Sequence, residues 1–498
     1  HAADGYARST GKTGVCFATS GPGATNTVTG IACAYMDSSP IVVITGQVPL
    51  PSIGRDSFQE VDIVGITLPI TKHSFFCKST EELAPAIRRA FQIAQSGRPG
   101  PVLVDVPKNL MVESTEYAPA PPLPLDVPPA ADAALLKKLA KAVNDAQRPV
   151  IYAGGGVILS GASEELTAFA EKSQIPVATT LMCLGAFDRR SPLSLGMVGM
   201  HGETDSNLAV HNSDLLISVG ARFSDRVTGD IPRFAKEATI VHIDIDLSEI
   251  DKNVTSDFHI IGDVRQILKS LLPMIKENKR EEWNRLVGSY RRDPAGPESG
   301  NGFGPDEIFS VLGKALGDDV IVATDVGQHQ MWTAQKWPFK KPRQLLTSGG
   351  LGAMGFGMGA AIGGKIANPD KRVILVTGDG SFRMNCAELI TVSAQELPIL
   401  VFVLKNNTLG MVRQWQKLFF DRRFSATDLP DVLDYVGLAA SVGLRGWHVG
   451  SVEGLEKAVS EALAYGKGAV IACDVYIDEN VWPIVPPGDA ISNQVTAE

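Results

Sequence analysis

The chain has no long hydrophobic run. No stretch of its 498 residues reaches the roughly 18 apolar residues that a membrane-spanning helix requires. Cysteine is scarce as well, since only six cysteines are scattered along the chain, without any C-x-x-C spacing. Neither a zinc site nor a disulfide framework is therefore indicated, and a reducing compartment is expected.

Clusters of basic residues are also missing. The 46 lysines and arginines are outnumbered by 55 aspartates and glutamates, which gives a net charge of −9. No basic run is interleaved with aromatic residues, and this argues against non-specific nucleic-acid binding. A composition of 44% hydrophobic and 20% charged residues is typical of a globular protein, and the length suits about three domains.

The start of the chain lacks an initiator methionine and any signal or transit pattern. Residues 1–14, HAADGYARSTGKTG, have helical spacing from the first position. We therefore expect the chain to begin inside a helix and to be incomplete at its N-terminus. A cytoplasmic location is expected, or a plastid or mitochondrial one if a transit peptide precedes His1.

Three regions of alternating strand and helix patterns follow one another, and each predicts a parallel sheet covered by helices. The predicted fold class is α/β, with three successive doubly wound parallel-sheet domains. The first domain is assigned to residues 1–116, incomplete at its start, and a proline-rich linker follows at 117–132. The second domain spans 133–275, a polar connection spans 276–302, and the third domain spans 303–498.

The third region holds the most informative pattern. The apolar run from Lys371 to Thr377 predicts a buried parallel strand that ends in a Gly-Asp-Gly triplet centred on Asp379. A second strand, Pro398 to Leu404, leads to Asn406. Ligands of open α/β sheets bind at such strand ends, and Mg²⁺ prefers oxygen ligands shared between the protein and phosphates. The pattern predicts a magnesium-diphosphate clamp, although the triplet alone is as often an ordinary turn.

The pairing of this triplet with an asparagine 27 positions after Asp379 resembles the motif of thiamine diphosphate (ThDP) enzymes. That family usually has two adjacent asparagines, and Lys405 and Asn406 occupy those two places here. The resemblance implies that Asp379, Asn406 and the main-chain carbonyl of Thr408 hold Mg²⁺, with Asn407 one position too far. Lys405 departs from the family pattern, and what compensates for the first asparagine stays open.

Other glycine-rich turns are weak signals by themselves. Residues 20–26, SGPGATN, join a strand to a helix with little side-chain bulk, which a plain tight turn also explains. Gly154 to Gly156 follow a predicted strand, but the G-x-G-x-x-G fingerprint is incomplete. The prediction of nucleotide binding at this turn is strengthened by three further segments at or after predicted strand ends, at 180–182, 199–202 and 220–223.

The segment 409–416, LGMVRQWQ, by itself fits the core stripe of a helix, because its apolar residues share one face. Together with SGPGATN, QHQMW at 328–332, GGLGAMGFG at 349–357 and the clamp, it resembles the catalytic large subunit of acetohydroxyacid synthase (acetolactate synthase). The similarity runs over essentially the whole chain. LGMVRQWQ is typical of that branch, whereas the GDG triplet is shared by all ThDP enzymes.

The resemblance implies a carboligase with ThDP, Mg²⁺ and FAD as cofactors. It would decarboxylate pyruvate and ligate the two-carbon unit to a second 2-oxo acid, pyruvate or 2-oxobutyrate, in branched-chain amino-acid biosynthesis. The first domain would bind the pyrimidine end of ThDP, the central domain FAD, and the third domain the diphosphate and Mg²⁺. ThDP would lie between two subunits, which implies a homodimer or homotetramer, and a small regulatory subunit is a further candidate partner.

Two alternatives stay open. The chain could be another ThDP-dependent decarboxylase or carboligase, of the pyruvate oxidase or glyoxylate carboligase type, which LGMVRQWQ disfavours and acetolactate formation from pyruvate would exclude. It could also be a non-catalytic ThDP-binding homologue, a hypothesis favoured by Lys405 and by the absence from the chain of the glutamate that activates ThDP in the family. Thermal stabilisation by ThDP without turnover, in a chain extended upstream, would support that second alternative.

Carried over position by position, the resemblance assigns the remaining site residues. Met354 would bend ThDP into its V shape, and Trp415 would bound the pocket for the alkyl group of the acceptor. Gln59, Phe58 and Lys108 would line the substrate channel. Further ThDP contacts fall on Gln328, His329, Met331, Gly352, Gly378, Gly380 and Ser381. FAD contacts fall on Arg98, Gly154, Gly155, Thr180, Leu181, Met200, His201, Arg222, Asp244 and Asp263.

The glutamate that activates ThDP in this family belongs to a segment upstream of His1, and no residue of the chain takes that role. We therefore expect negligible carboligation from the chain His1 to Glu498, because the pyrimidine ring lacks its partner. Acetolactate formation by this chain should be compared with that of a chain extended upstream. Full activity of the shorter form would contradict the expectation.

Overall fold

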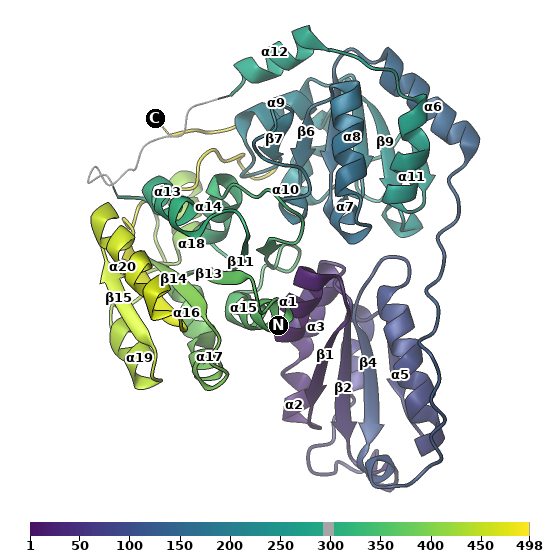
Figure 1. The fold of residues 1–498 in the computed structure, drawn as a ribbon, viewed down its shortest axis with the longest axis vertical. Helices are drawn as coiled ribbons and strands as arrows, with labels where there is room; N and C mark the ends of the chain where they lie inside the picture. The colour runs from purple at the N-terminus through teal and green to yellow at the C-terminus, as the bar shows by residue number, and fades with distance from the viewer. Residues whose placement is uncertain (292–302, 498) are drawn as a thin grey trace.

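The computed structural model describes residues 1–291 and 303–497 and shows three parallel sheets in succession along the chain (Figure 1). Helices cover these sheets, so the predicted fold class, three successive parallel-sheet α/β domains, is confirmed. The positions of the domain boundaries stay predictions. Residues 292–302, which belong to the predicted polar connection, lie outside the described residues.

The strands within each sheet pair in parallel register. The first sheet, in the order β1-β2-β4-β3, contains β1 (Gly14–Ala18), β2 (Ile41–Gln47), β3 (His73–Phe76) and β4 (Val102–Pro107). The second, β10-β9-β8-β5-β6-β7, contains β5 (Pro149–Ala153), β6 (Val177–Thr179), β7 (Ser194–Met197), β8 (Leu215–Val219), β9 (Thr239–Asp244) and β10 (Phe258–Ile261). The third, β12-β11-β13-β14-β16-β15, contains β11 (Val320–Thr324), β12 (Leu345–Leu346), β13 (Arg372–Gly378), β14 (Ile399–Lys405), β15 (Arg445–Val449) and β16 (Ala469–Asp474).

The α-helices alternate with the strands in all three domains. The first domain has α1 (Ala2–Thr10), α2 (Pro22–Thr25), α3 (Val28–Met36), α4 (Ile63–Thr67) and α5 (Thr80–Gln95). The second has α6 (Ala133–Asp145), α7 (Gly155–Leu159), α8 (Ser163–Ser173), α9 (Thr204–His211), α10 (Asp225–Thr228), α11 (Val264–Leu271) and α12 (Glu281–Ser289). The third has α13 (Pro305–Leu316), α14 (Gln328–Lys336), α15 (Phe356–Ala367), α16 (Asp379–Asn385), α17 (Leu389–Ala394), α18 (Gly410–Phe419), α19 (Tyr435–Ser441) and α20 (Val452–Tyr465).

The burial of the central strands explains why their sequences are short, continuous apolar runs. Every residue of β5, β8, β11 and β14 is buried, since helices cover both faces of these sheets. The proline-rich segment 117–132 contains no helix or strand and passes along the outside of the molecule between α5 and α6 (Figure 1). Within the described residues, no helix combines the length and apolar character needed to cross a membrane.

The first and third domains touch through α1 and α15, which lie side by side (Figure 1). Their backbones meet at glycines. A Cβ atom added to Gly363 would lie 1.8 Å from the carbonyl oxygen of Ala2, and one added to Gly5 would lie 2.3 Å from that of Ala360. Because neither glycine has a positive φ, space rather than backbone conformation demands glycine at these positions.

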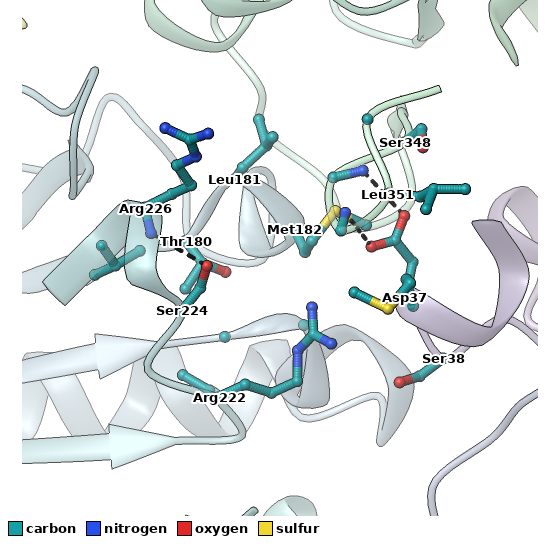
Figure 2. Close-up of a pocket in the computed structure, with 18 of the residues that line it drawn as sticks. Asp37, Ser38, Thr180, Leu181, Met182, Arg222, Ser224, Arg226, Ser348 and Leu351 are labelled. Atoms are coloured by element: carbon teal, nitrogen blue, oxygen red, sulfur yellow. Dashed lines mark hydrogen bonds between the residues drawn. The ribbon is translucent and has the colours of Figure 1, made fainter. Parts of the chain in front are cut away.

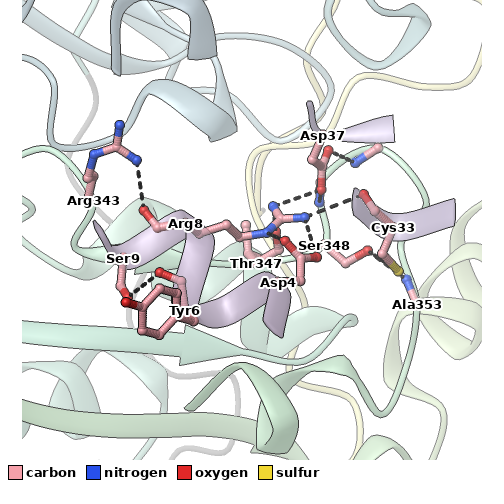
Figure 3. Close-up of polar contacts among 12 residues, drawn as sticks. Asp4, Tyr6, Arg8, Ser9, Cys33, Asp37, Arg343, Thr347, Ser348 and Ala353 are labelled. Atoms are coloured by element: carbon pink, nitrogen blue, oxygen red, sulfur yellow. Dashed lines mark hydrogen bonds and ion pairs between the residues drawn. The ribbon is translucent and has the colours of Figure 1, made fainter. Parts of the chain in front are cut away.

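Arg8 of α1 is buried in the same interface. Its Nε donates to Asp4 Oδ1 at 2.7 Å, and its Nη1 donates to Asp37 Oδ2 at 3.0 Å and to the carbonyl oxygen of Thr347 at 2.7 Å (Figure 3). Burial alone lowers the pKa of Arg8, but the charges of Asp4 and Asp37 raise it above its ordinary value. A paired guanidinium thus joins α1 and α3 of the first domain to the segment after β12 of the third.

Replacement of Gly363 by alanine tests the contact between α1 and α15. We expect the Gly363→Ala variant to lose roughly 1 to 3 kcal/mol of stability, because the new methyl group overpacks the interface. Gly313→Ala is the matched control: Gly313 also lies in a helix, and its Cβ would meet nothing within 4 Å. There the higher helix propensity of alanine should raise stability by up to about 1 kcal/mol. Equal unfolding midpoints of the two variants in scanning calorimetry would contradict this account.

Candidate active site

The predicted clamp lies where the carboxyl ends of neighbouring parallel strands meet. Gly378, the last residue of β13, pairs with Leu404 of β14, so the residues after both strands lie close together. Asp379 begins α16 and is 1% exposed. Its Oδ1 accepts a hydrogen bond from the backbone N–H of Gly380 at 2.9 Å, and its Oδ2 accepts one from that of Asn407 at 2.7 Å. Burial raises the pKa of Asp379, while these two hydrogen bonds act against that rise.

The Asn406 side chain is oriented by its neighbours. Its Nδ2 donates to Gln328 Oε1 at 3.2 Å, and its Oδ1 accepts from the backbone N–H of Thr408 at 3.2 Å. Gln328 Nε2 in turn donates to the carbonyl oxygen of Glu479 at 2.8 Å. The structure therefore gathers Asp379, Asn406 and Thr408, the three residues predicted to hold Mg²⁺, at one edge of the third sheet. Carboxylate, amide and carbonyl oxygens suit that ion.

Lys405, the departure from the family pattern, has its own partners. It stands opposite Asp474 in the register of β14 and β16. Its Nζ donates to Asp431 Oδ2 at 3.0 Å and lies 3.5 Å from Asp474 Oδ1. Two carboxylates thus pair with the charge of the lysine.

Polar atoms without partners fit the diphosphate end of ThDP. Among the described residues, His329 Nε2 and Asn407 Oδ1 are buried and have no hydrogen-bond partner. Burial lowers the pKa of His329 to about 3, so its imidazole is neutral near pH 7. A Cβ on Gly378 would lie 2.8 Å from His329 Nδ1, so glycine lets the ring lie against the strand end. Buried unpaired polar atoms of this kind need an explanation, and a polar ligand supplies one.

Met354 connects the clamp with a large cavity. A Cβ on Gly380 would lie 3.6 Å from Met354 Cε, so this side chain reaches the triplet. Met354 also lines a cavity of about 1630 Å³, together with Met331, Gly352 and Trp415. Four residues predicted to contact ThDP or substrate therefore share one cavity.

All ten residues predicted to contact FAD line the same cavity: Arg98, Gly154, Gly155, Thr180, Leu181, Met200, His201, Arg222, Asp244 and Asp263. Figure 2 shows Arg222 pointing into its centre, opposite Thr180 and Met182. Thr180 Oγ1 and His201 Nδ1 are buried without partners among the described residues, and burial lowers the pKa of His201 to about 4. The volume and these free polar atoms fit a dinucleotide such as FAD.

The cavity lies where all three domains meet. Arg98 of the first domain donates from Nη1 to Asp246 Oδ2 at 3.1 Å and to Glu249 Oε1 at 2.6 Å in the second. Its Nε donates to Ser38 Oγ at 2.8 Å. Burial raises the pKa of the neighbouring Asp244 to about 6. Charged groups of two domains therefore close one side of the cavity.

Several cavity residues were missed by the sequence interpretation. Arg226 is one of them: its guanidinium carbon lies 5.9 Å from the centre of the Trp415 ring, where a cation–π contact is favourable. Asp37 is another, and it lines the same cavity (Figure 2). Arg226 follows the segment 220–223 closely, so a search for cations just after strand ends would have found it. Nothing in the local sequence marks Asp37.

The predicted channel residues of the first domain lie elsewhere. Gln59, Phe58 and Lys108 are exposed and do not line the cavity, and Phe58 is 88% exposed. Gln59 packs beside the SGPGATN turn, since a Cβ on Gly21 would lie 2.9 Å from Gln59 Cα. All three residues are thus exposed on the surface of the first domain in the single chain.

Comparison with known protein families agrees with the three-domain architecture described above. Three family models match successive parts of the chain: the N-terminal TPP binding domain of thiamine pyrophosphate enzymes at residues 1–66, their central domain at 136–271, and their C-terminal TPP binding domain at 325–473. Thiamine pyrophosphate (TPP) is another name for ThDP. The clamp and Trp415 fall within the third match, and nine of the ten residues predicted to contact FAD fall within the second.

Curated relatives match nearly the whole chain. A probable acetolactate synthase large subunit of Methanocaldococcus jannaschii is 45% identical over 99% of this chain and 86% of its own length. The acetolactate synthase large subunit of Parasynechococcus marenigrum is 46% identical over 99% and 82%. The isozyme 2 large subunit of Escherichia coli is 44% identical over 99% and 90%. The chain therefore belongs to the thiamine pyrophosphate enzyme family, in which these relatives are acetolactate synthase large subunits.

Proposed function

We propose that the chain is the catalytic subunit of an acetolactate-forming carboligase. It decarboxylates pyruvate and joins the two-carbon unit to pyruvate or 2-oxobutyrate, a reaction of branched-chain amino-acid biosynthesis. One observation carries the proposal: the cluster of Asp379, Asn406 and Thr408 lies beside Met354, whose cavity is also lined by Trp415. Relatives that are 44 to 46% identical over the whole chain are named for the same product.

The strand-end cluster would hold the metal and the diphosphate. Asp379, Asn406 and the carbonyl of Thr408 would supply three oxygen ligands to Mg²⁺, and diphosphate oxygens would complete its shell. Neutral His329 would offer a hydrogen bond without adding charge. Further contacts would come from Gln328, Met331, Gly352, Gly378, Gly380 and Ser381. When bound, ThDP supplies the carbon nucleophile and the electron sink that decarboxylation requires.

Two side chains at the cavity would select the substrates. The guanidinium of Arg226 suits the carboxylate of a 2-oxo acid, because it can donate two parallel hydrogen bonds. Trp415 faces Arg226 and would bound the pocket for the alkyl group of the acceptor. One methylene group in such a pocket is worth only about 1 to 3 kcal/mol, so the preference for 2-oxobutyrate should be moderate.

The large cavity would hold FAD through the ten residues that line it. The reaction has no net redox change, so the flavin would be mainly structural. Its place at the junction of the three domains agrees with that role, since a ligand there contacts all of them. Binding to the folded state alone would also stabilise the protein.

The free surface with Gln59, Phe58 and Lys108 would face the third domain of a second copy, which would complete each active site. A homodimer or homotetramer is therefore part of the proposal. Escherichia coli relatives are named as large subunits of two isozymes, which supports a small regulatory subunit as a further partner. We also propose the cytoplasm as the compartment, which agrees with six free cysteines.

Acetolactate formation tests the proposal directly. A form of the protein extended upstream of His1, supplied with Mg²⁺, ThDP and FAD, should convert pyruvate to acetolactate. Asp379→Asn in this form should lower the rate more than 100-fold, because loss of even an outer-shell partner of a metal typically costs roughly 10- to 100-fold. Asp428→Asn is the matched control, because this nearby side chain is 76% exposed. Its activity should stay close to that of the wild type.

Other outcomes would overturn the proposal in distinct ways. Consumption of pyruvate without acetolactate would indicate another ThDP-dependent decarboxylase. A rise in melting temperature with ThDP, but no turnover of any 2-oxo acid, would indicate a non-catalytic homologue.

A further inference from the structure

The segment 347–355 presents cofactor contacts without a regular backbone. It connects β12 with α15 and contains neither helix nor strand. Gly352 and Gly355 have φ angles of +68° and +83°, in the left-handed region that favours glycine. Met354 lies between them and reaches the clamp. Because a glycine-rich segment has many accessible conformations, contacts from outside must select the one that places Met354.

Asp37 supplies such contacts at the start of this segment. The aspartate follows α3 of the first domain, and its side chain is fully buried, with 0% exposed. Its Oδ2 accepts from the backbone N–H of Gly349 at 3.0 Å, and its Oδ1 accepts from that of Gly350 at 2.7 Å. Hydrogen bonds to a carboxylate are stronger than neutral ones. A first-domain carboxylate therefore holds two successive peptide groups of the third domain.

Arg8 fixes the orientation of this carboxylate. Its Nη1 bridges Asp37 Oδ2 and the carbonyl oxygen of Thr347, two residues before Gly349 (Figure 3). The other edge of the guanidinium binds Asp4 through Nε and Nη2. Within the part of the chain that the structure describes, Asp4 makes no hydrogen bond to the segment. Two aspartates thus share one arginine, but only Asp37 reaches the segment 347–355.

The far end of the segment is held within the third domain. Asp325 Oδ1 accepts from the backbone N–H of Gly357 at 2.8 Å, at the start of α15. In the middle, Ser348 Oγ accepts from the backbone N–H of Ala353 at 3.1 Å. Without Asp37, the segment would keep these anchors and the hydrogen bonds from Gln330 to Thr347 and Ser348, while Gly349 and Gly350 would lose two charge-assisted hydrogen bonds.

We propose that Asp37 is a positioning residue for ThDP binding. Through Gly349 and Gly350 it holds the segment that presents Gly352 and Met354, so the affinity of the third domain for its cofactor depends on a first-domain carboxylate. The inference rests on the proposed function. If the segment spends less time in the binding conformation, the apparent dissociation constant rises by the same factor.

Calorimetric titration of the full-length protein with ThDP in the presence of Mg²⁺ tests this role. We expect Asp37→Ala to raise the dissociation constant about tenfold, which corresponds to a segment that holds its binding conformation a tenth of the time. An unchanged constant would overturn the inference.

Asp4→Ala is the matched control, because Asp4 has the same chemistry, is 1% exposed and binds the same arginine. We expect it to lower the melting temperature, since Arg8 loses a partner, but to leave the ThDP dissociation constant within about twofold of the wild type. If both variants raise that constant equally, the effect is general destabilisation and the proposed role of Asp37 is wrong.

Gly350→Ala provides a second route if Asp37→Ala does not fold. Its Cβ would lie 2.9 Å from Asp37 Oδ1 and 2.9 Å from Met36 Cβ, so the methyl group separates the segment from Asp37 while all charges stay. A similar rise in the dissociation constant is expected, and wild-type affinity would overturn the inference. Wild-type protein that binds no ThDP at all would instead overturn the proposed function, and the inference with it.

Discussion

The contact between α1 and α15 is the constraint on which the arrangement of the active site depends. Two helices that are far apart in the sequence meet backbone to backbone, because Gly5 and Gly363 leave no side chain between them. Arg8 is buried beside this contact and is stable there only because two carboxylates surround it. Close packing and a paired buried charge therefore place the first domain against the segment that contacts the cofactor.

The third sheet turns this placement into a chemical site. Parallel strands end at one edge, so residues separated by a whole helix in the sequence become neighbours there. Asp379 begins a helix at that edge, and the backbone of Asn407 turns toward it. Lys405 is the last residue of β14, and its charge is paired with Asp431 and Asp474. An unusual residue in the motif is thus compatible with an intact strand end.

The large cavity depends on all three domains. Its walls include Arg98 and Asp37 from the first domain, Arg222 from the second and Met354 from the third. Met331, Gly352 and Met354, which are predicted to contact ThDP, line the same cavity as the ten residues predicted to contact FAD. A change at any domain contact can therefore alter binding at a distance, which is the physical basis for the role proposed for Asp37.

The sequence alone determined the elements of the fold and most of the candidate site. Short apolar runs between helical patterns predicted parallel sheets, because strands covered on both faces must be apolar throughout, and β11 and β14 are buried over their whole length. The spacing of the motif located Asp379 and Asn406, because the helical stretch and the strand that separate these two residues vary little in length. Only the tertiary structure decided which distant residues share a surface. Asp37 has no local pattern, and its role depends on domain packing that no short stretch of sequence encodes.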